Sequence, residues 1–369
     1  MKRIHQFEHS LQPFRDSAHP HADQHLADRM RYYGIPGVSI ALIERGSLAW
    51  AQGYGVCDEI TAIPVTSGTR FPIASITKPI VGLAVLRLVQ QGVLELDSDV
   101  NRYLTSWKLP ESVHMHETKV TLRHLLSHGA GTSTYGFWGY RPTSSIPTLV
   151  QVLDGVPPAN SVPVRVVRPP GSQWSYSGGG YCIIQQLLSD VVGQPFPNVL
   201  ADLVFAPLEM HASICTVLPA AEHETLCAHG HDATGAPIEG HWRAHPELAS
   251  AGVWSTPADI ARLAMALQRA HAKEAHAVLA PELVKQMFSP QISNWGLGVA
   301  IDSAGATARF AHGGAVIGFR SYLVAYVERG QGAVITTNGD RGDELCVEIL
   351  HSLARVYNWP EYYHYLDKP

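Results

Sequence analysis

A serine and a lysine three residues apart could form a nucleophile and its base. Ser75 and Lys78 lie in the stretch Phe71-Pro72-Ile73-Ala74-Ser75-Ile76-Thr77-Lys78, which leads into an apolar run over residues 80–89 that Gly92 ends. The helical spacing of that run predicts a helix whose first turn contains Ser75, with Lys78 on the same face. A lysine amine kept neutral by burial or by nearby positive charge can accept the serine proton, and a helix N-terminus favours the oxyanion that forms on attack.

The Ser-x-x-Lys spacing is too short to decide the function alone. Roughly 0.4 chance matches are expected in a chain of this size. An ordinary helix with a surface serine and lysine would show the same pattern, so further motifs have to support the chemistry.

A tyrosine in a glycine-rich segment is the second candidate. Tyr176-Ser177-Gly178 falls in a predicted tight loop over residues 171–180, ahead of a predicted helix over residues 181–191. Alternatively, the loop could only reverse the chain direction, with the Tyr176 ring packed inside it. If the phenol lies near Ser75 and Lys78, nearby cations would lower its pKa, so that it could take the serine proton and later activate water.

The third candidate is the segment His312-Gly313-Gly314-Ala315, which closes one predicted strand and opens the next. Its two glycines would let a substrate lie along the strand edge, where backbone N–H groups can donate to an oxyanion. Like-charge repulsion from Lys78 should lower the pKa of His312 and leave it mostly neutral, able to donate one hydrogen bond to Tyr176 or to a substrate oxygen. We then expect its titration to give a limb of the pH profile. A histidine that merely packs at a strand end is the alternative.

Together, the three motifs resemble those of the serine β-lactamase and penicillin-binding-protein superfamily, in particular its class C–like branch of esterases and D-amino-acid peptidases. Ser75-x-x-Lys78 matches the first motif, Tyr176-Ser177-Gly178 stands at the Tyr-x-Asn motif, and His312-Gly313-Gly314 stands at the Lys-Thr-Gly motif. Residues 122–128 and 295–298 also look like recurrent family segments. The resemblance covers roughly residues 20–357.

The resemblance implies a concrete mechanism. Ser75 would be acylated, and Lys78 and Tyr176 would move protons. The backbone N–H groups of Ser75 and Ala315 would form the oxyanion hole. Such enzymes need no metal and no organic cofactor.

Two departures from the family pattern bear on the substrate. Gly178 replaces the usual asparagine and so removes a side-chain amide that would bond a substrate amide carbonyl. His312 replaces the usual lysine, so the fixed cation that pairs with a β-lactam carboxylate becomes titratable. Both changes weaken the case for an efficient β-lactamase and are compatible with an esterase or a peptidase.

The order of predicted elements suggests one sheet built from both ends of the chain. A hairpin over residues 38–55 opens it, and strands are predicted over residues 296–301, 309–312, 319–326 and 332–337. Helices are predicted over residues 1–32, 121–128, 181–191, 196–205, 257–270, 281–287 and 344–357.

We therefore expect an α/β (α+β) fold of the β-lactamase/transpeptidase-like type, with an antiparallel sheet flanked by helices. Residues 1–73 and 285–369 would form the lobe with the sheet. Residues 74–284 would form a mainly helical lobe with the active-site loops.

Composition excludes several other functions. The 369 residues carry a net charge of −5 with no basic run, which argues against nucleic acid as a partner, and no apolar stretch reaches membrane-spanning length. The N-terminus lacks an apolar signal region, and the five scattered cysteines form no Cys-x-x-Cys pair, so we expect a cytoplasmic protein without a disulfide framework. The 20 histidines, among them His124 and His128, include no His-Glu-x-x-His motif, and we predict no metal site.

The function that we expect is a carboxylesterase acting on small uncharged esters through an acyl-enzyme. Aromatic residues near the presumed site would suit an apolar acyl or alcohol group, although core packing explains them equally well: Tyr135, Phe137, Trp138, Tyr140 and Trp295. We assign substrate contacts to Gly178, Gly313, Gly314, Trp138, Tyr140 and Trp295. A D-amino-acid peptidase or amidase, a weak β-lactamase, an acyltransferase of the same fold and a catalytically silent scaffold stay open, and the sequence predicts no oligomeric state.

Overall fold

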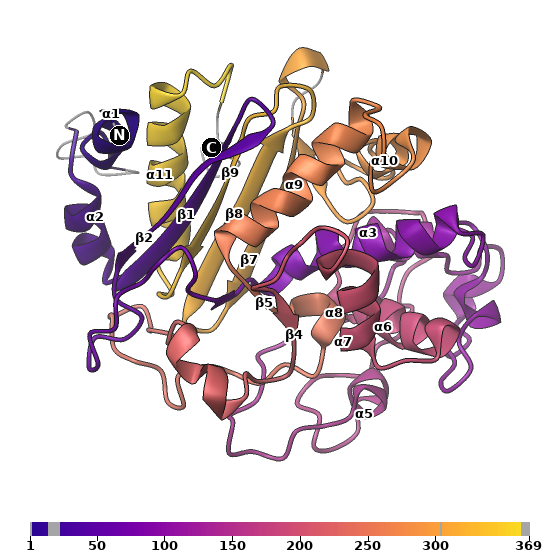
Figure 1. Ribbon diagram of the computed structural model, residues 1–369. Helices are drawn as coiled ribbons and strands as arrows, with labels where there is room; N and C mark the ends of the chain where they lie inside the picture. Colours follow the sequence, from indigo (N-terminus) through magenta and orange to yellow (C-terminus); the bar gives the residue numbers. More distant parts are fainter. Residues whose placement is uncertain (1, 14–22, 303–304, 363–369) are drawn as a thin grey trace.

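A six-stranded antiparallel sheet forms the centre of one side of the molecule (Figure 1). The computed structural model describes residues 2–13, 23–302 and 305–362. The strand order is β2-β1-β9-β8-β7-β6. The strands are β1 (Gly37–Glu44), β2 (Ser47–Gly55), β6 (Ala300–Asp302), β7 (Arg309–Val316), β8 (Phe319–Tyr326) and β9 (Gly332–Thr337). β1 pairs with β9, so the two ends of the chain build one sheet, which confirms the predicted fold class.

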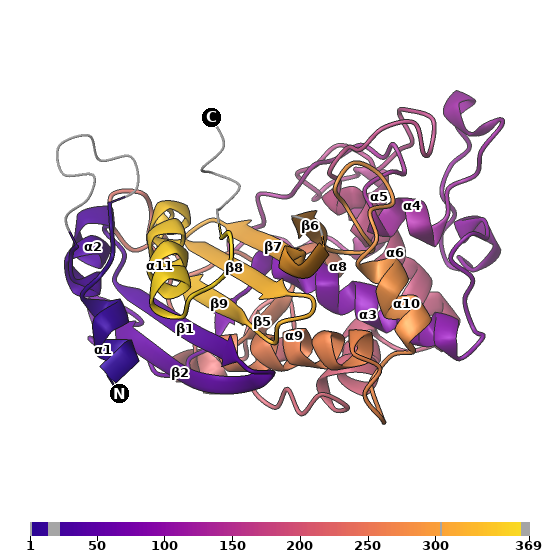
Figure 2. The same cartoon turned by 90° about the horizontal axis from the view of Figure 1, so that it is seen from above.

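Helices cover both faces of this sheet, as Figure 2 shows from above. α11 (Gly342–Val356) contacts β8 and β9 on one face, and α1 (Lys2–Glu8) and α2 (Leu26–Tyr33) pack against it. α9 (Pro257–His271) contacts β1, β2, β8 and β9 on the other face. Because both faces are covered, β1 is an almost continuous apolar run in which every residue but the last is buried.

The chain between β2 and β6 contains eight α-helices joined by long segments that hold no α-helix. Its helices are α3 (Thr77–Gln90), α4 (Leu122–Leu126), α5 (Leu149–Asp154), α6 (Gly178–Val192), α7 (Phe196–Leu200), α8 (Leu248–Ala251), α9 and α10 (Pro281–Met287). Three short strands, β3 (Phe71–Pro72), β4 (Ile214–Cys215) and β5 (Val253–Ser255), form a second sheet in the order β3-β5-β4. α3 is buried along most of its length and contacts α7, α8 and α10, which fixes the residues at its N-terminal end.

Four element boundaries near the predicted motifs differ from the expectation. Ser75 lies in a 3₁₀ turn, Ala74–Ile76, and the α-helix begins only at Thr77. α6 begins at Gly178 rather than at residue 181, because the Ser177 side chain accepts the Gly180 N–H and caps the helix there. β7 continues to Val316 because it stays paired with β8, whereas the predicted strand over residues 296–301 is reduced to β6.

Other differences lie farther from these motifs. The helix predicted over residues 196–205 is α7 followed by a π-helix, Ala201–Phe205. The polar helix predicted over residues 1–32 is two helices, α1 and α2, and residues 14–22 lie outside the described residues. The division into two lobes stays a prediction, but α9, from the segment assigned to the helical lobe, packs on the sheet.

The described helices include none long and apolar enough to cross a membrane. All five cysteines are free and buried.

Candidate active site

Ser75 is held in a strained turn beside strand β7. Ala74, just before it, has φ 50°, a left-handed conformation that residues other than glycine rarely adopt. Ser321 Oγ on β8 donates a hydrogen bond to the Ile73 carbonyl at 2.9 Å and so ties the turn to the sheet. β7 approaches so closely that a Cβ at Gly314 would lie 2.3 Å from the Ile73 carbonyl oxygen. Glycine at position 314 therefore allows the strand and the nucleophile turn to meet.

Lys78 is fully buried, and its amine lies beside Ser75. Its Nζ lies 3.0 Å from Ser75 Oγ, 2.9 Å from the Ser250 carbonyl oxygen and 3.3 Å from Ser250 Oγ. Burial lowers the pKa of Lys78 from 10.5 to about 7, because removal from water disfavours the ammonium form. Near neutral pH, a large share of the molecules therefore carry a neutral amine that can accept the Ser75 proton.

Tyr176 lies over the same amine, with its ring centroid 5.1 Å from Lys78 Nζ. Burial raises the pKa of Tyr176, and a hydrogen bond with Ser75 offsets only part of that shift. The expectation that nearby cations would lower this pKa is wrong, because burial of the phenol dominates the shift and raises the pKa. In the free protein Tyr176 is therefore a phenol that can donate or relay a proton, and not a tyrosinate.

His312 lies on β7 with its side chain buried. Burial, and then the charge on Lys78, lower its pKa to about 3, so the ring is neutral as expected but does not titrate near neutral pH. Its Nδ1 lies 2.7 Å from the Gly313 carbonyl oxygen, which can only accept, so the ring proton is on Nδ1. Nε2 is then an acceptor. The expectation that His312 donates a hydrogen bond to Tyr176 or to a substrate oxygen is therefore wrong, because Nε2 carries no proton.

The two backbone groups predicted for the oxyanion hole lie in segments that the fold brings together. The Ala74–Ile76 turn contacts β7, and β7 carries Ala315. At Gly313 an added Cβ would come no closer than 3.6 Å to Tyr322, so packing does not require glycine there. The oxyanion and substrate-binding roles of these residues stay predictions.

Trp295 lies among the rings of the site. Its ring centroid is 5.0 Å from that of His128, 5.5 Å from that of His312 and 5.9 Å from that of Tyr176. The predicted position of Trp295 near the catalytic residues therefore agrees with the structure, and its contact with substrate stays a prediction.

The other aromatic residues predicted near the site differ in their position and exposure. The Tyr135 ring centroid is 4.9 Å from that of Tyr176, and the Tyr135 side chain is 74% exposed. Trp138 is 77% exposed, on the surface of the protein. Tyr140 is buried, and its hydroxyl accepts the backbone N–H of Asn160, which indicates a role in packing the loop instead of a place at the site.

His128 belongs to the site although its spacing from His124 gave no sign of it. It is fully enclosed, with φ 60°, and its ring centroid is 4.2 Å from that of Tyr176. Its Nδ1 accepts the backbone N–H of Ser177 at 3.1 Å, so it holds the segment that follows Tyr176. Burial lowers the pKa of His128 well below its usual value, and Lys78 adds to that shift. Only the family-like segment over residues 122–128 could have pointed to this residue.

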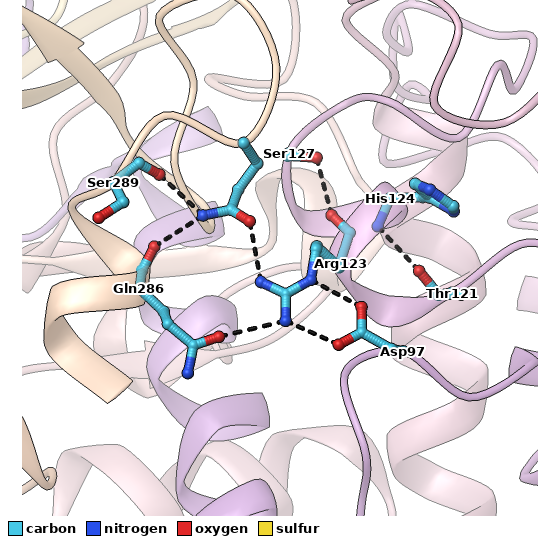
Figure 3. Close-up of polar contacts among 8 residues, drawn as sticks. Asp97, Thr121, Arg123, His124, Ser127, Gln286 and Ser289 are labelled. Carbon is cyan, nitrogen blue, oxygen red and sulfur yellow. Dashed lines mark hydrogen bonds and ion pairs between the residues drawn. The ribbon is translucent and has the colours of Figure 1, made fainter. Parts of the chain in front are cut away.

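A polar network fixes α4, the helix that ends just before His128. Arg123 on α4 donates to both carboxylate oxygens of Asp97, at 2.7 and 2.8 Å, and to Gln286 Oε1 at 3.1 Å (Figure 3). Gln286 belongs to α10, which precedes the loop of Trp295. The contact between Arg123 and Gln286 thereby connects the segment that carries His128 with the segment that carries Trp295.

With this geometry in view, comparison with known proteins identifies the family. A family model described as beta-lactamase matches residues 22–353. The chain belongs to this family. The predicted resemblance is therefore confirmed.

The chain is similar to esterase EstB of Burkholderia gladioli, with 32% identity over 228 residues, which are 58% of this chain and 54% of EstB. The chain thus spans about half the length of that relative. Penicillin-binding protein 4 of Amycolatopsis lactamdurans is 27% identical over 359 residues, which are 92% of this chain and 91% of that protein. The structure of an octameric penicillin-binding protein homologue from Pyrococcus abyssi superposes with a TM-score of 0.75 and 22% identity, covering 90% of this chain and 76% of that one.

Within the described part of the chain, no group of three or more histidine, cysteine, aspartate or glutamate side chains is arranged to hold a metal ion.

Proposed function

We propose that the protein is a serine hydrolase that forms an acyl-enzyme on Ser75. The observation that carries the proposal is the 3.0 Å separation between Lys78 Nζ and Ser75 Oγ, together with a pKa of Lys78 of about 7. The neutral amine takes the Ser75 proton as Oγ attacks the substrate carbonyl carbon. Tyr176, a phenol beside Ser75, donates its proton to the departing alkoxide and is reprotonated by the Lys78 ammonium. Water then hydrolyses the acyl-enzyme, and one of its protons returns to Ser75 Oγ through Lys78. The backbone N–H groups of Ser75 and Ala315 stabilise the oxyanion in both steps.

We infer that the preferred substrates are small uncharged esters. The neutral ring of His312 stands where related enzymes carry a lysine, so this position offers no fixed cation to an anionic substrate. The rings of Trp295, Tyr135 and Trp174 lie around Tyr176 and offer apolar surface for an acyl or alcohol group. The similarity to a protein named as an esterase supports the same inference.

Hydrolysis of p-nitrophenyl acetate and butyrate tests the reaction type. The Ser75→Ala variant should lose kcat/KM by about 1,000-fold or more, because no other group replaces the nucleophile. Ser67→Ala, at an exposed turn position, is the matched control and should behave like the wild type. Ester hydrolysis that survives Ser75→Ala would contradict the proposal.

Three further substrates test the substrate class. A chromogenic cephalosporin and a D-Ala-D-Ala peptide should be turned over more slowly than the esters, because both are anionic amides. Faster turnover of the peptide would assign a peptidase instead. An added alcohol that diverts the acyl group into a new ester would assign an acyltransferase.

A further inference from the structure

Ser250 supplies two of the three oxygen atoms around the Lys78 amine. Its carbonyl oxygen lies 2.9 Å and its Oγ 3.3 Å from Nζ, and Ser75 Oγ is the third at 3.0 Å. We propose that Ser250 is a positioning residue that directs the lone pair of Lys78 at Ser75. This inference rests on the proposed role of Lys78 as the base.

Hydrogen-bond accounting at Nζ leads to this assignment. A neutral lysine amine has two N–H donors and one lone pair. The Ser250 carbonyl can only accept, so it takes one N–H. When Ser250 Oγ accepts the second N–H, the lone pair is left for the Ser75 hydroxyl, which is the arrangement that a general base requires. After proton transfer, the ammonium group donates its three N–H groups to the same three oxygens.

The support around Ser250 is rigid. The residue is buried on α8, a short helix that contacts α3, α6 and the turn of Ser75. The side chain of Gln185 on α6 holds both sides of the segment: its Oε1 accepts the Ala249 N–H at 3.0 Å, and its Nε2 donates to the Pro246 carbonyl at 3.1 Å. The backbone position of Ser250 is therefore held by contacts that do not involve the lysine.

Gly178 makes room for the Ser250 hydroxyl. A Cβ at position 178 would lie 2.8 Å from Ser250 Oγ, closer than real Cβ contacts come, and 3.2 Å from both Phe137 Cε2 and the Tyr135 carbonyl oxygen. Glycine at position 178 and the hydroxyl at position 250 therefore depend on each other. The hydroxyl occupies space that a side chain at position 178 would need.

The first test is the Ser250→Ala variant, assayed with p-nitrophenyl acetate and by the rate of fluorophosphonate labelling of Ser75. We expect kcat to fall by about 10-fold or more while KM changes little, because the amine is no longer directed at Ser75. The acid limb of the pH profile should also move to lower pH, because the ammonium form loses an acceptor. Ser352→Ala, which removes another buried hydroxyl far from the site, is the control and should change neither quantity. A folded Ser250→Ala protein with the wild-type kcat and an unmoved acid limb would overturn the proposal.

The second test measures the coupling between positions 178 and 250. Gly178→Ala should reduce kcat clearly in the wild-type background and much less in the Ser250→Ala background, where the clash with Oγ is gone. The contacts with Phe137 and Tyr135 are the same in both backgrounds, so the difference reports on Ser250 alone. An equal reduction in both backgrounds would overturn the arrangement.

Failure of this inference is distinguishable from failure of the proposed function. Wild-type protein that neither hydrolyses the esters nor reacts at Ser75 with fluorophosphonate would overturn the proposed function and the premise taken from it. Wild-type reactivity that depends on Ser75 but is unaffected by Ser250→Ala would overturn only the role of Ser250.

Discussion

Lys78, Tyr176 and His312 are each shifted towards the neutral form for one physical reason, which is burial. A buried amine or imidazole loses its proton more easily, and a buried phenol keeps its proton more firmly. Near neutral pH the site therefore contains a neutral acid, a neutral imidazole and a Lys78 amine that is neutral in a large share of the molecules. In those molecules Lys78 becomes charged when it takes up the Ser75 proton.

Variants of His312 identify the group whose titration causes the acid limb in the pH profile of kcat/KM. With a pKa of about 3, His312 is already neutral wherever the protein is assayed, so the limb near pH 7 belongs to Lys78. His312→Ala should keep that limb near pH 7. His312→Lys should move it to lower pH, because a second cation disfavours the charged form of Lys78. The loss of the limb in His312→Ala would show instead that the imidazole is the titrating group.

At the scale of elements, a buried ionic network fastens α2 to α11. Arg29 on α2 donates to both carboxylate oxygens of Glu348 on α11, at 2.7 Å each, and Tyr33 donates to the same carboxylate at 2.7 Å. Arg29 is 2% exposed and Glu348 is fully buried. These contacts hold α2 against α11, which covers one face of the sheet.

Removal of Arg29 should leave the buried Glu348 carboxylate without its guanidinium partner. We expect Arg29→Ala to lower the free energy of unfolding by about 3–5 kcal/mol, and Arg29→Met combined with Glu348→Leu to be less destabilising than Arg29→Ala alone. Arg31→Ala breaks the exposed pair with Asp28 on the same helix and should cost less than about 1 kcal/mol. Urea denaturation of the four proteins checks the order. Equal losses for the buried and the exposed pair would contradict this account.

How far the sequence predicts the fold depends on the kind of signal. Periodicity and turn residues define β8, β9 and α10 with the bounds that the structure has, because local pattern and tertiary pairing agree there. The same signals miss the extension of β7 to Val316, since its glycines weaken the strand pattern while pairing with β8 maintains it. They also miss the start of α6 at Gly178, where a side-chain cap outweighs the low helix propensity of glycine.

The candidate site was predictable only where motif residues carry it. Ser75, Lys78, Tyr176 and His312 come together as their motifs suggested, from the Ala74–Ile76 turn, α3, the loop before α6 and β7. Ser250 and His128 act through contacts between segments distant in the chain, and no local spacing reveals such contacts. The direction of the Tyr176 pKa shift was mispredicted because it depends on the burial of the phenol, which the sequence does not specify.

For the molecule as a whole, the buried base costs stability. The pKa of Lys78 is about 7 in the folded protein and near 10.5 in the unfolded chain. Between these two values the unfolded chain binds more protons, so the free energy of unfolding rises with pH across this window, and the penalty is complete below pH 7. Burial of Lys78 therefore favours the neutral amine that the reaction needs but lowers the free energy of unfolding.

Lys78→Met should remove that penalty. We expect the variant to be more stable than the wild type by an amount on the order of a few kcal/mol below neutral pH, with the gain shrinking as the pH approaches 10.5. Chemical denaturation of both proteins at several pH values measures the difference. A gain that is the same at every pH would mean that titration of Lys78 does not cause it.

Formation of the acyl-enzyme tests the central claim most directly. The protein is mixed with p-nitrophenyl acetate, quenched in acid at short times, and analysed by intact mass and peptide mapping. We predict one acetyl group on Ser75, formed at a rate that falls below about pH 7 as Lys78 is protonated, and slowed by about 10²- to 10⁴-fold in Lys78→Ala. An acetyl group on another residue, or wild-type acylation of Ser75 in Lys78→Ala, would contradict the account.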